Sequence, residues 1–388
     1  MKRLIILTTV SLVTVFTPFG MREVSARPCD ITVPTEQPTI QDAINSANPG
    51  NKICVKPGTY TEDLFIDKDN LELAGSGFPT VVGVGKGDTS VNPFPTAVPN
   101  INIQANGVKI HNFTIMSPTI TSGAEYASGI VLTGTDIEIY KNHFVVSKGT
   151  PGSQGIQTWA LDNAPLGNRD ISGLKIYKNR FTSTGSSGFG YEAIFINPQS
   201  DPVPQGKPGE VVIDKNFFSG ELYRAIGIQR GNASVEKNKM STDLAPTSTA
   251  DFGDVPWGIK VFDGFDGINP VQLGNVNIEK NKIGFGGAAQ FNVGIRLESL
   301  VTDTSVDKNH IKSPFQDGIS VAGDGNSIEK NKVQNASANG ILVEGDNNSF
   351  RMNIVKGSAN IDINDVGLGN SFFKNKCDTS TPVDVCTP

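Results

Sequence analysis

The chain has 388 residues, with 33 Lys and Arg against 39 Asp and Glu, and its formal net charge is −6. It has few helix-favouring runs and holds 42 Gly and 23 Pro, which disfavours a mainly helical fold. The negative net charge argues against a nucleic-acid-binding protein, whose binding face is basic. An acidic polymer still fits as a partner, because a local basic strip can coexist with a net negative surface.

The first residues are typical of a signal peptide. Lys2 and Arg3 precede an apolar run from Leu4 to Phe19, and Val24-Ser25-Ala26 is a small-x-Ala cleavage site. A membrane anchor is the alternative, but the run is shorter than about 18 residues and is broken by Thr and Pro. We therefore predict a signal peptide at 1–26, and a protein that is secreted, periplasmic or at the cell surface, with no transmembrane segment once the signal is removed.

Four cysteines fit an oxidising compartment. Cys29 and Cys54 flank the start of the mature fold, and Cys377 and Cys386 flank its end. Pairing each cysteine with its local neighbour would close a loop at either end of the fold. Three connectivities are open at the level of the sequence.

Residues 27–60 are expected to form an N-terminal cap. Thr39-Ile40-Gln41-Asp42 resembles a capping box, and Ile40, Ala43, Ile44 and Ala47 follow at helical spacing. Pro49-Gly50 ends the helix. A short helix at 39–48, followed by a first strand, would cover the exposed edge of a stack of strands.

A recurring motif then organises the chain, and Ile328–Val333 is one copy. Its Asn recurs with successive gaps of 37, 37, 22, 43, 28, 22, 22 and 22 residues, at positions 142, 179, 216, 238, 281, 309, 331, 353 and 375. A base period of 22 residues, each unit holding short strands and no helix, predicts the stacked coils of a β-solenoid. We expect the Asn to occupy a left-handed bend and to form a ladder along the axis.

Length alone would allow two or three domains, but the repeat indicates one elongated domain at 61–376 with a disulfide-closed tail at 377–388. Together, Thr39–Ala47, Ile53–Tyr60, Leu71–Gly77 and the Lys-Asn repeats resemble the right-handed parallel β-helix proteins of the pectin-lyase-like superfamily. The resemblance spans about residues 35–377 and implies an all-β, right-handed parallel β-helix.

The superfamily includes polysaccharide lyases, uronate epimerases and NosD-like periplasmic proteins, and it hosts many functions on one fold. The catalytic blocks of pectin methylesterases (Gly-Ser-Val-Asp-Phe-Ile-Phe-Gly), polygalacturonases (Asp-Asp and Gly-His-Gly) and alginate epimerases (Asp-Pro-His-Asp) are absent. No catalytic residue is therefore carried over from the family.

Insertions into the 22-residue coil predict where a site lies. They precede one strand at 145–155, 182–193, 241–257 and 284–293, and follow it at 160–172, 197–210 and 263–275. Loops on both sides of one sheet would make its outer face the floor of a lateral cleft over 156–298. Alternation predicts that Lys260 and Arg296 lie one coil apart on this floor. Amides and aromatic rings predicted to contact substrate are Gln157, Trp159, Asn197, Gln229, Trp257 and Phe262.

These groups suit an acidic polysaccharide, because aromatic faces stack on sugars and cations neutralise carboxylates. The preferred reaction is pectate- or uronate-lyase-like elimination, with Lys260 or Arg296 as base and Glu298 as a further acid candidate. The resemblance implies Ca²⁺ as the cofactor of related lyases, and Asp263 and Asp266 are the candidate ligands; plain turn residues are the alternative. We expect a monomer. Alternative functions are a non-catalytic module that binds glycan or a surface, a glycoside hydrolase, and a uronate epimerase.

Overall fold

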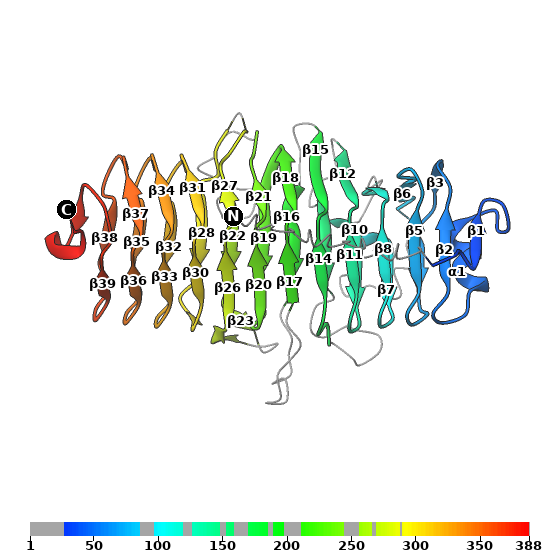
Figure 1. Ribbon diagram of the computed structural model, residues 1–388, viewed down its shortest axis with the longest axis horizontal. Helices are drawn as coiled ribbons and strands as arrows, with labels where there is room; N and C mark the ends of the chain where they lie inside the picture. Colours follow the sequence, from blue (N-terminus) through cyan, green and yellow to red (C-terminus); the bar gives the residue numbers. More distant parts are fainter. Residues whose placement is uncertain are drawn as a thin grey trace, which may run out of the picture.

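The structure, a computed structural model, describes residues 27–85, 97–118, 126–147, 153–158, 170–184, 189–197, 211–243, 256–265, 269–287 and 289–387. The predicted signal peptide lies outside these residues. Within them, no helix is long and apolar enough to cross a membrane. Figure 1 shows coils stacked along one axis, from the blue N-terminal end to the red C-terminal end.

Each coil contributes one strand to each of three parallel sheets, which we name sheets A, B and C. Within the described residues, sheet A has 13 strands: β1 (Ile31–Val33), β2 (Lys52–Val55), β5 (Glu72–Gly75), β8 (Lys109–His111), β11 (Glu138–Tyr140), β14 (Lys175–Tyr177), β17 (Val211–Asp214), β20 (Ala233–Glu236), β26 (Val276–Glu279), β30 (Ser305–Asp307), β33 (Ser327–Glu329), β36 (Ser349–Arg351) and β39 (Ser371–Phe373).

Sheet B follows the turn after each sheet A strand, and from β12 onward this turn contains the ladder Asn. Its 11 described strands are β3 (Thr59–Thr61), β6 (Thr80–Val82), β9 (Thr114–Met116), β12 (His143–Ser147), β15 (Arg180–Thr184), β18 (Phe217–Gly220), β21 (Lys239–Met240), β27 (Lys282–Ile283), β31 (His310–Lys312), β34 (Lys332–Gln334) and β37 (Ile354–Lys356).

Sheet C completes the coil. Its 12 described strands are β4 (Leu64–Ile66), β7 (Ala97–Gln104), β10 (Tyr126–Thr133), β13 (Ser153–Thr158), β16 (Phe189–Ile196), β19 (Leu222–Ile228), β22 (Trp257–Val261), β28 (Val293–Leu297), β32 (Ile319–Val321), β35 (Ile341–Val343), β38 (Ile363–Asp365) and β40 (Ser380–Thr381). Outside the three sheets, β23 (Gly264–Phe265) pairs antiparallel with β24 (Pro270–Val271), and β25 (Leu273–Gly274) pairs with β29 (Val301–Thr302).

The core is a set of columns in which like residues stack on like. Ile156, Ile194, Ile226, Ile259 and Ile295 share one register on sheet C and are fully buried. On sheet B the rings of Phe144, Phe181 and Phe218 stack with centroids 4.7 and 4.9 Å apart. The parallel register therefore places each apolar repeat position over its copy, which is how units too small to fold alone bury a continuous core.

The predicted Asn ladder is confirmed. The backbone N–H of Asn309 donates to Oδ1 of Asn331 at 2.9 Å, its Nδ2 donates to the same oxygen at 3.0 Å, and Nδ2 also donates to the carbonyl of Ile278. This arrangement repeats from Asn142 to Asn375, and these Asn residues are 0–2 % exposed. Each Asn thereby satisfies backbone groups that the turn would otherwise leave buried and unpaired.

The predicted left-handed Asn is wrong by one position. The residue before the ladder Asn has the positive φ, as Lys330 at 51° and Met352 at 53° show. The Asn itself must direct its amide inward to reach its copies, so the bend falls on the exposed side chain before it. Met352 shows that this position requires no charge.

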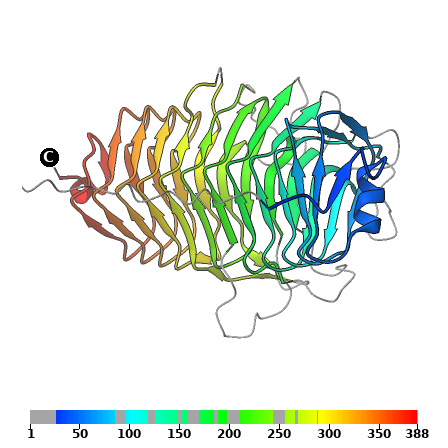
Figure 2. The same ribbon diagram turned by 45° about the vertical axis from the view of Figure 1, so that its right-hand side comes forward.

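The N-terminal helix is confirmed as α1 (Ile40–Ser46), with Thr39 as its N-cap. Thr39 Oγ1 accepts a hydrogen bond from the backbone N–H of Asp42 at 3.0 Å. The carboxylate of Glu62 accepts from the N–H groups of Ile40 and Gln41, a contribution that sequence spacing does not indicate. Figure 2 shows α1 at the N-terminal end of the stack.

Both disulfides join local neighbours. Cys29 pairs with Cys54 beside the helix, and Cys377 pairs with Cys386 next to the 3₁₀ helix η2 (Val383–Val385). Their Cα atoms lie 5.6 and 5.5 Å apart. The two bridges close loops at the two ends, where a coil has a neighbour on one side only.

Candidate functional site

The predicted register of the candidate site is confirmed on the outer face of sheet C. Lys260 on β22 lies directly beside Arg296 on β28, and Gly227 on β19 precedes them in the same row. Both cations face away from the Ile column, which fills the interior. The insertions that would wall a cleft fall largely outside the described residues, so the cleft itself stays a prediction.

Lys260, Arg296 and Glu298 form one ion cluster. Lys260 Nζ lies 2.7 Å from Glu298 Oε1, and Arg296 Nε lies 3.0 Å from the same oxygen. Arg296 also donates through Nη2 to Glu298 Oε2 at 3.3 Å. The side chain of Lys260 is 6 % exposed, whereas that of Arg296 is 34 % exposed, so Arg296 is the more exposed of the two cations.

Aromatic rings enclose the ammonium group of Lys260. Its Nζ lies 4.5 Å from the ring centroid of Trp257 and 4.4 Å from that of Phe262. Trp257 comes three residues before Lys260 yet shares its face, because the strand bends at Gly258, where a Cβ would point inward at Met240 and Ile283. Trp257 is 0 % exposed and has no face for a sugar, whereas Phe262 is partly exposed.

A second buried ion pair lies next to the cluster. Arg224 Nη1 lies 3.3 Å from Glu192 Oε1, and the two side chains are 6 and 4 % exposed. The Arg224 guanidinium also lies 4.2 Å from the Trp257 ring centroid. Burial raises the pKa of Glu192, although Arg224 beside it acts in the opposite sense.

Arg224 precedes the strand Ile, whereas the alternation predicts the outward positions that follow it. Glu192, Arg224 and Trp257 each come two residues before that Ile, in consecutive coils, and they share one register. This spacing is visible in the sequence and could have identified the second row. The outer face of sheet C therefore includes a row before the strand Ile in addition to the predicted positions after it.

The predicted amide ligands are engaged within the protein. Gln157 is 3 % exposed and donates to Ser128 Oγ at 3.0 Å, and Asn197 is 5 % exposed and donates to the carbonyl of Thr158. Gln229 donates to the carbonyl of Asp263 at 3.0 Å and is partly exposed. Trp159 lies outside the described residues. Gln229 is thus the predicted amide with surface left for a ligand.

The candidate calcium ligands do not form a binding cluster in the described part of the chain. Asp263 Oδ1 accepts from the N–H of Leu300 at 2.7 Å, and Oδ2 accepts from the Ser299 hydroxyl at 3.4 Å. Asp266 lies outside the described residues, and among those described no three His, Cys, Asp or Glu side chains are grouped to hold a metal. Both carboxylate oxygens of Asp263 are therefore hydrogen-bonded within the protein, and its role as a Ca²⁺ ligand stays a prediction.

Replacing Glu298 by Gln should remove a pH dependence of stability. Burial acts to raise the pKa of Glu298, but hydrogen bonds from Arg296 and Lys260 outweigh it and hold the pKa below 4.5. An ionised group of this kind stabilises the fold above its unfolded pKa and loses that effect as pH falls through the folded value. Unfolding in urea at several pH values should show a constant difference between wild type and Glu298→Gln above about pH 5, shrinking below it. A difference that widens in acid would contradict the cluster.

No family model and no curated protein matches the sequence. Solved structures match the fold. The tailspike protein of an E. coli bacteriophage, in complex with a pentasaccharide, has a TM-score of 0.58 at 11% identity, over 88% of this chain and 60% of that one. PfbA, a surface adhesin of Streptococcus pneumoniae, has a TM-score of 0.50 at 15% identity, over 87% and 86% of the two chains. The periplasmic alginate epimerase AlgG has a TM-score of 0.49 at 13% identity, over 87% and 71%.

This chain spans 60% of the tailspike chain, and at these identities the likeness concerns the fold alone. Three long parallel sheets, one coil per repeat and the expected opening motifs agree with it. The protein folds as a right-handed parallel β-helix.

Proposed function

We propose that the protein binds an acidic polysaccharide across the outer face of sheet C and cleaves it by elimination. The observation that carries this proposal is the cluster of Arg296, Glu298 and Lys260. Arg296 presents a partly exposed guanidinium. A guanidinium group can form two parallel hydrogen bonds with a planar carboxylate such as that of a uronate. The partly exposed ring of Phe262 and the amide of Gln229 lie on the same face and would contact sugar rings and hydroxyls.

Elimination requires a neutralised uronate carboxylate, a base and an acid. Arg296 would meet the carboxylate of the sugar, and Glu298, ionised at neutral pH, would accept the proton from C5. The C4–O bond then breaks, its electrons leave with the oxygen, and the C5–H electrons form the C4–C5 double bond. Lys260 would donate a proton to the leaving oxygen and recover it from Glu298 across their 2.7 Å contact.

The fold relatives and the disulfides support a glycan outside the cytoplasm. The tailspike relative was solved with a pentasaccharide, and PfbA, with a TM-score of 0.50, is a surface adhesin. Two disulfides are typical of a protein in an oxidising compartment, so we propose that this protein is exported.

A non-catalytic glycan-binding module is the second candidate. The burial of Lys260 and the pairing of Glu298 with two cations favour it, because both proton-transfer groups are already neutralised. In this case Arg296 would still bind an acidic sugar, and the Lys260–Glu298 pair would hold Arg296 in place.

Arg296→Ala should weaken binding of acidic oligosaccharides by about tenfold or more, because a charged hydrogen-bonding partner is lost. Binding to polygalacturonate, alginate and chondroitin fragments would be measured by calorimetry, with the exposed Arg351→Ala variant as matched control. Unchanged binding in Arg296→Ala would overturn the site.

Turnover separates the candidate functions. Wild type would be incubated with the same polymers, with and without Ca²⁺, and the absorbance of the C4–C5 double bond followed. Elimination predicts product in wild type and none in Glu298→Gln, with binding retained. Binding without any product supports the module, and new reducing ends without the absorbance support hydrolysis.

A further inference from the structure

The outer face of sheet B carries a series of cations from β15 to β37, in a chain of net charge −6. None of its eleven described strands contains Asp or Glu, whereas they contain Arg180, Lys239, Lys282, Lys312, Lys332 and Lys356. All six of these cationic residues are exposed. We call this surface the sheet B strip.

Four of the six cations of the strip lie in one row, and Lys312 and Lys356 lie in a second row two residues further along their strands. Arg180, Phe217, Lys239, Lys282, His310 and Lys332 are register partners on consecutive strands. The row extends over five steps of about 4.8 Å each. Lys239 and Lys282 are direct neighbours, and like charges placed opposite each other destabilise a sheet.

The turns before sheet B carry a second row of lysines, and ion pairs neutralise that row but not the row on the sheet. The turn residues Lys237, Lys280 and Lys330 come two positions earlier in the same coils, and each forms an ion pair with the acid just before it, namely Glu236, Glu279 and Glu329. Within the described residues, Lys239, Lys282 and Lys332 form no ion pair. The asymmetry leaves the strip free to meet an anion from outside.

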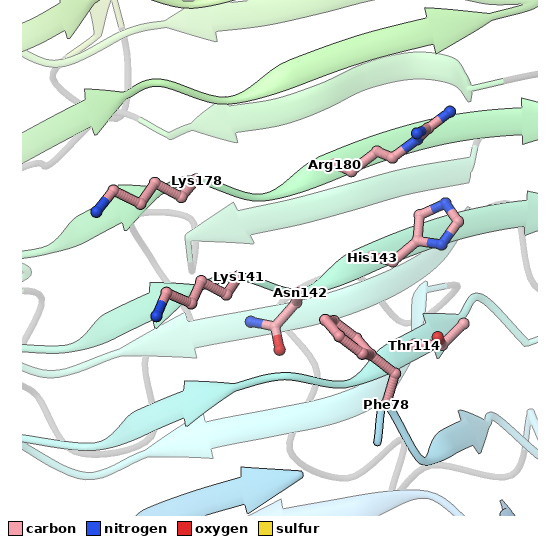
Figure 3. A pocket seen from close by; sticks show the side chains of 7 residues that line it. All are labelled: Phe78, Thr114, Lys141, Asn142, His143, Lys178 and Arg180. Atoms are coloured by element: carbon pink, nitrogen blue, oxygen red, sulfur yellow. The ribbon is translucent and has the colours of Figure 1, made fainter. Parts of the chain in front are cut away.

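A pocket of about 540 Å³ lies at the N-terminal end of the strip. In the coils that form this pocket, Tyr140 and Tyr177 occupy the position that is Glu or Asp in several later coils. Lys141 and Lys178 therefore have no acidic residue directly before them in the chain. The pocket is lined by Phe78, Thr114, Lys141, Asn142, His143, Lys178 and Arg180. In Figure 3 the Phe78 ring lies between the lysine side and the side of His143 and Arg180.

We infer that the sheet B strip binds a linear acidic polysaccharide, anchored in this pocket. Phe78 is 52 % exposed and Phe217 lies between Arg180 and Lys239, so aromatic rings lie beside cations at the pocket end of the strip, where they could contact a charged sugar chain. Thr114 adds a hydroxyl. The disulfides indicate an oxidising compartment, where glycans rather than nucleic acids are the common linear polyanions. The strip lies on a different sheet from Arg296 and does not depend on that site.

The test compares two triple variants of the full chain, both made in the Arg296→Ala background so that sheet C does not contribute. One carries Lys239→Gln, Lys282→Gln and Lys332→Gln. Its matched control carries Lys237→Gln, Lys280→Gln and Lys330→Gln, with the same change of charge in the same coils. Binding to heparin and polygalacturonate oligosaccharides, neutral dextran and duplex DNA would be measured over a range of salt concentrations.

The strip variant should lose about tenfold or more of its affinity for the acidic oligosaccharides, with a shallower salt dependence, because fewer counterions are released. The control should retain most of its affinity, and dextran should not bind. Equal losses in the two variants, no loss in either, or DNA binding tighter than every acidic glycan would each overturn the inference. If only the sheet C proposal is wrong, Arg296→Ala by itself leaves binding unchanged. The comparison of the two triple variants then still tests the sheet B strip.

Discussion

Replacing Arg224 by Met should lower the free energy of unfolding by about 3–5 kcal/mol, the usual cost of leaving one partner of a buried ion pair alone. The Glu192 carboxylate is 4 % exposed, and Arg224 is the cation 3.3 Å away. Met fills a similar volume and keeps contact with the Trp257 ring, so the loss reports charge rather than a cavity. Urea unfolding followed by circular dichroism measures it.

The loss should depend on pH in a defined direction. Burial already raises the pKa of Glu192 above 4.5 in the folded protein, and removal of Arg224 should raise it further. A carboxyl whose folded pKa is raised binds its proton more tightly in the folded state, so stability falls as pH rises from the unfolded pKa to the folded one. The deficit of Arg224→Met should therefore be small near pH 4.5 and grow towards neutrality.

Two further variants complete the test. Glu192→Gln combined with Arg224→Met should recover most of the lost stability, because no buried charge remains. Arg351→Met, which removes an exposed cation 3.9 Å from Glu329, should change stability by about 0.5 kcal/mol or less. An Arg224→Met deficit that stays the same from pH 4.5 to 7.5 would show that charge burial is not its cause.

The periodicity of the sequence predicts most of the fold. The 22-residue spacing of the Asn predicts the stack, the ladder and the register, because a slip of one residue would turn every Ile of a strand outward. It could not place the bend on Lys330, since Asn and Lys both stand at the turn and Asn tolerates positive φ better. What decides is the inward hydrogen bonding of the Asn, which is a property of the stack.

The candidate site was predicted only as far as the backbone determines it. Alternation from Ile259 and Ile295 places Lys260 beside Arg296, as observed. The link of both cations to Glu298 depends on how far three long side chains reach, and strand spacing does not give that. The bend at Gly258, which turns Trp257 towards Lys260, likewise interrupts the alternation on which the prediction relied.

Replacing Asn281 by Ala should cost about 2–4 kcal/mol of unfolding free energy, because several buried groups lose their partners together. Asn281 Oδ1 accepts from the backbone N–H and Nδ2 of Asn238 at 2.9 and 3.0 Å, while its own Nδ2 donates to the carbonyl of Val235 and to Asn309. The side chain lies inside the coil and is 0 % exposed, so water does not replace these bonds.

The adjacent Lys280 offers the matched control for this variant. Lys280→Met should change stability by about 1 kcal/mol or less, since Met352 already occupies the same left-handed position and the Lys280–Glu279 pair is exposed. Urea unfolding of both variants, at an unchanged slope against denaturant, gives the comparison. If Asn281→Ala lowers the free energy of unfolding no more than Lys280→Met does, the apolar columns alone hold the stack together. The recurrence of Asn along this chain then has a different physical cause.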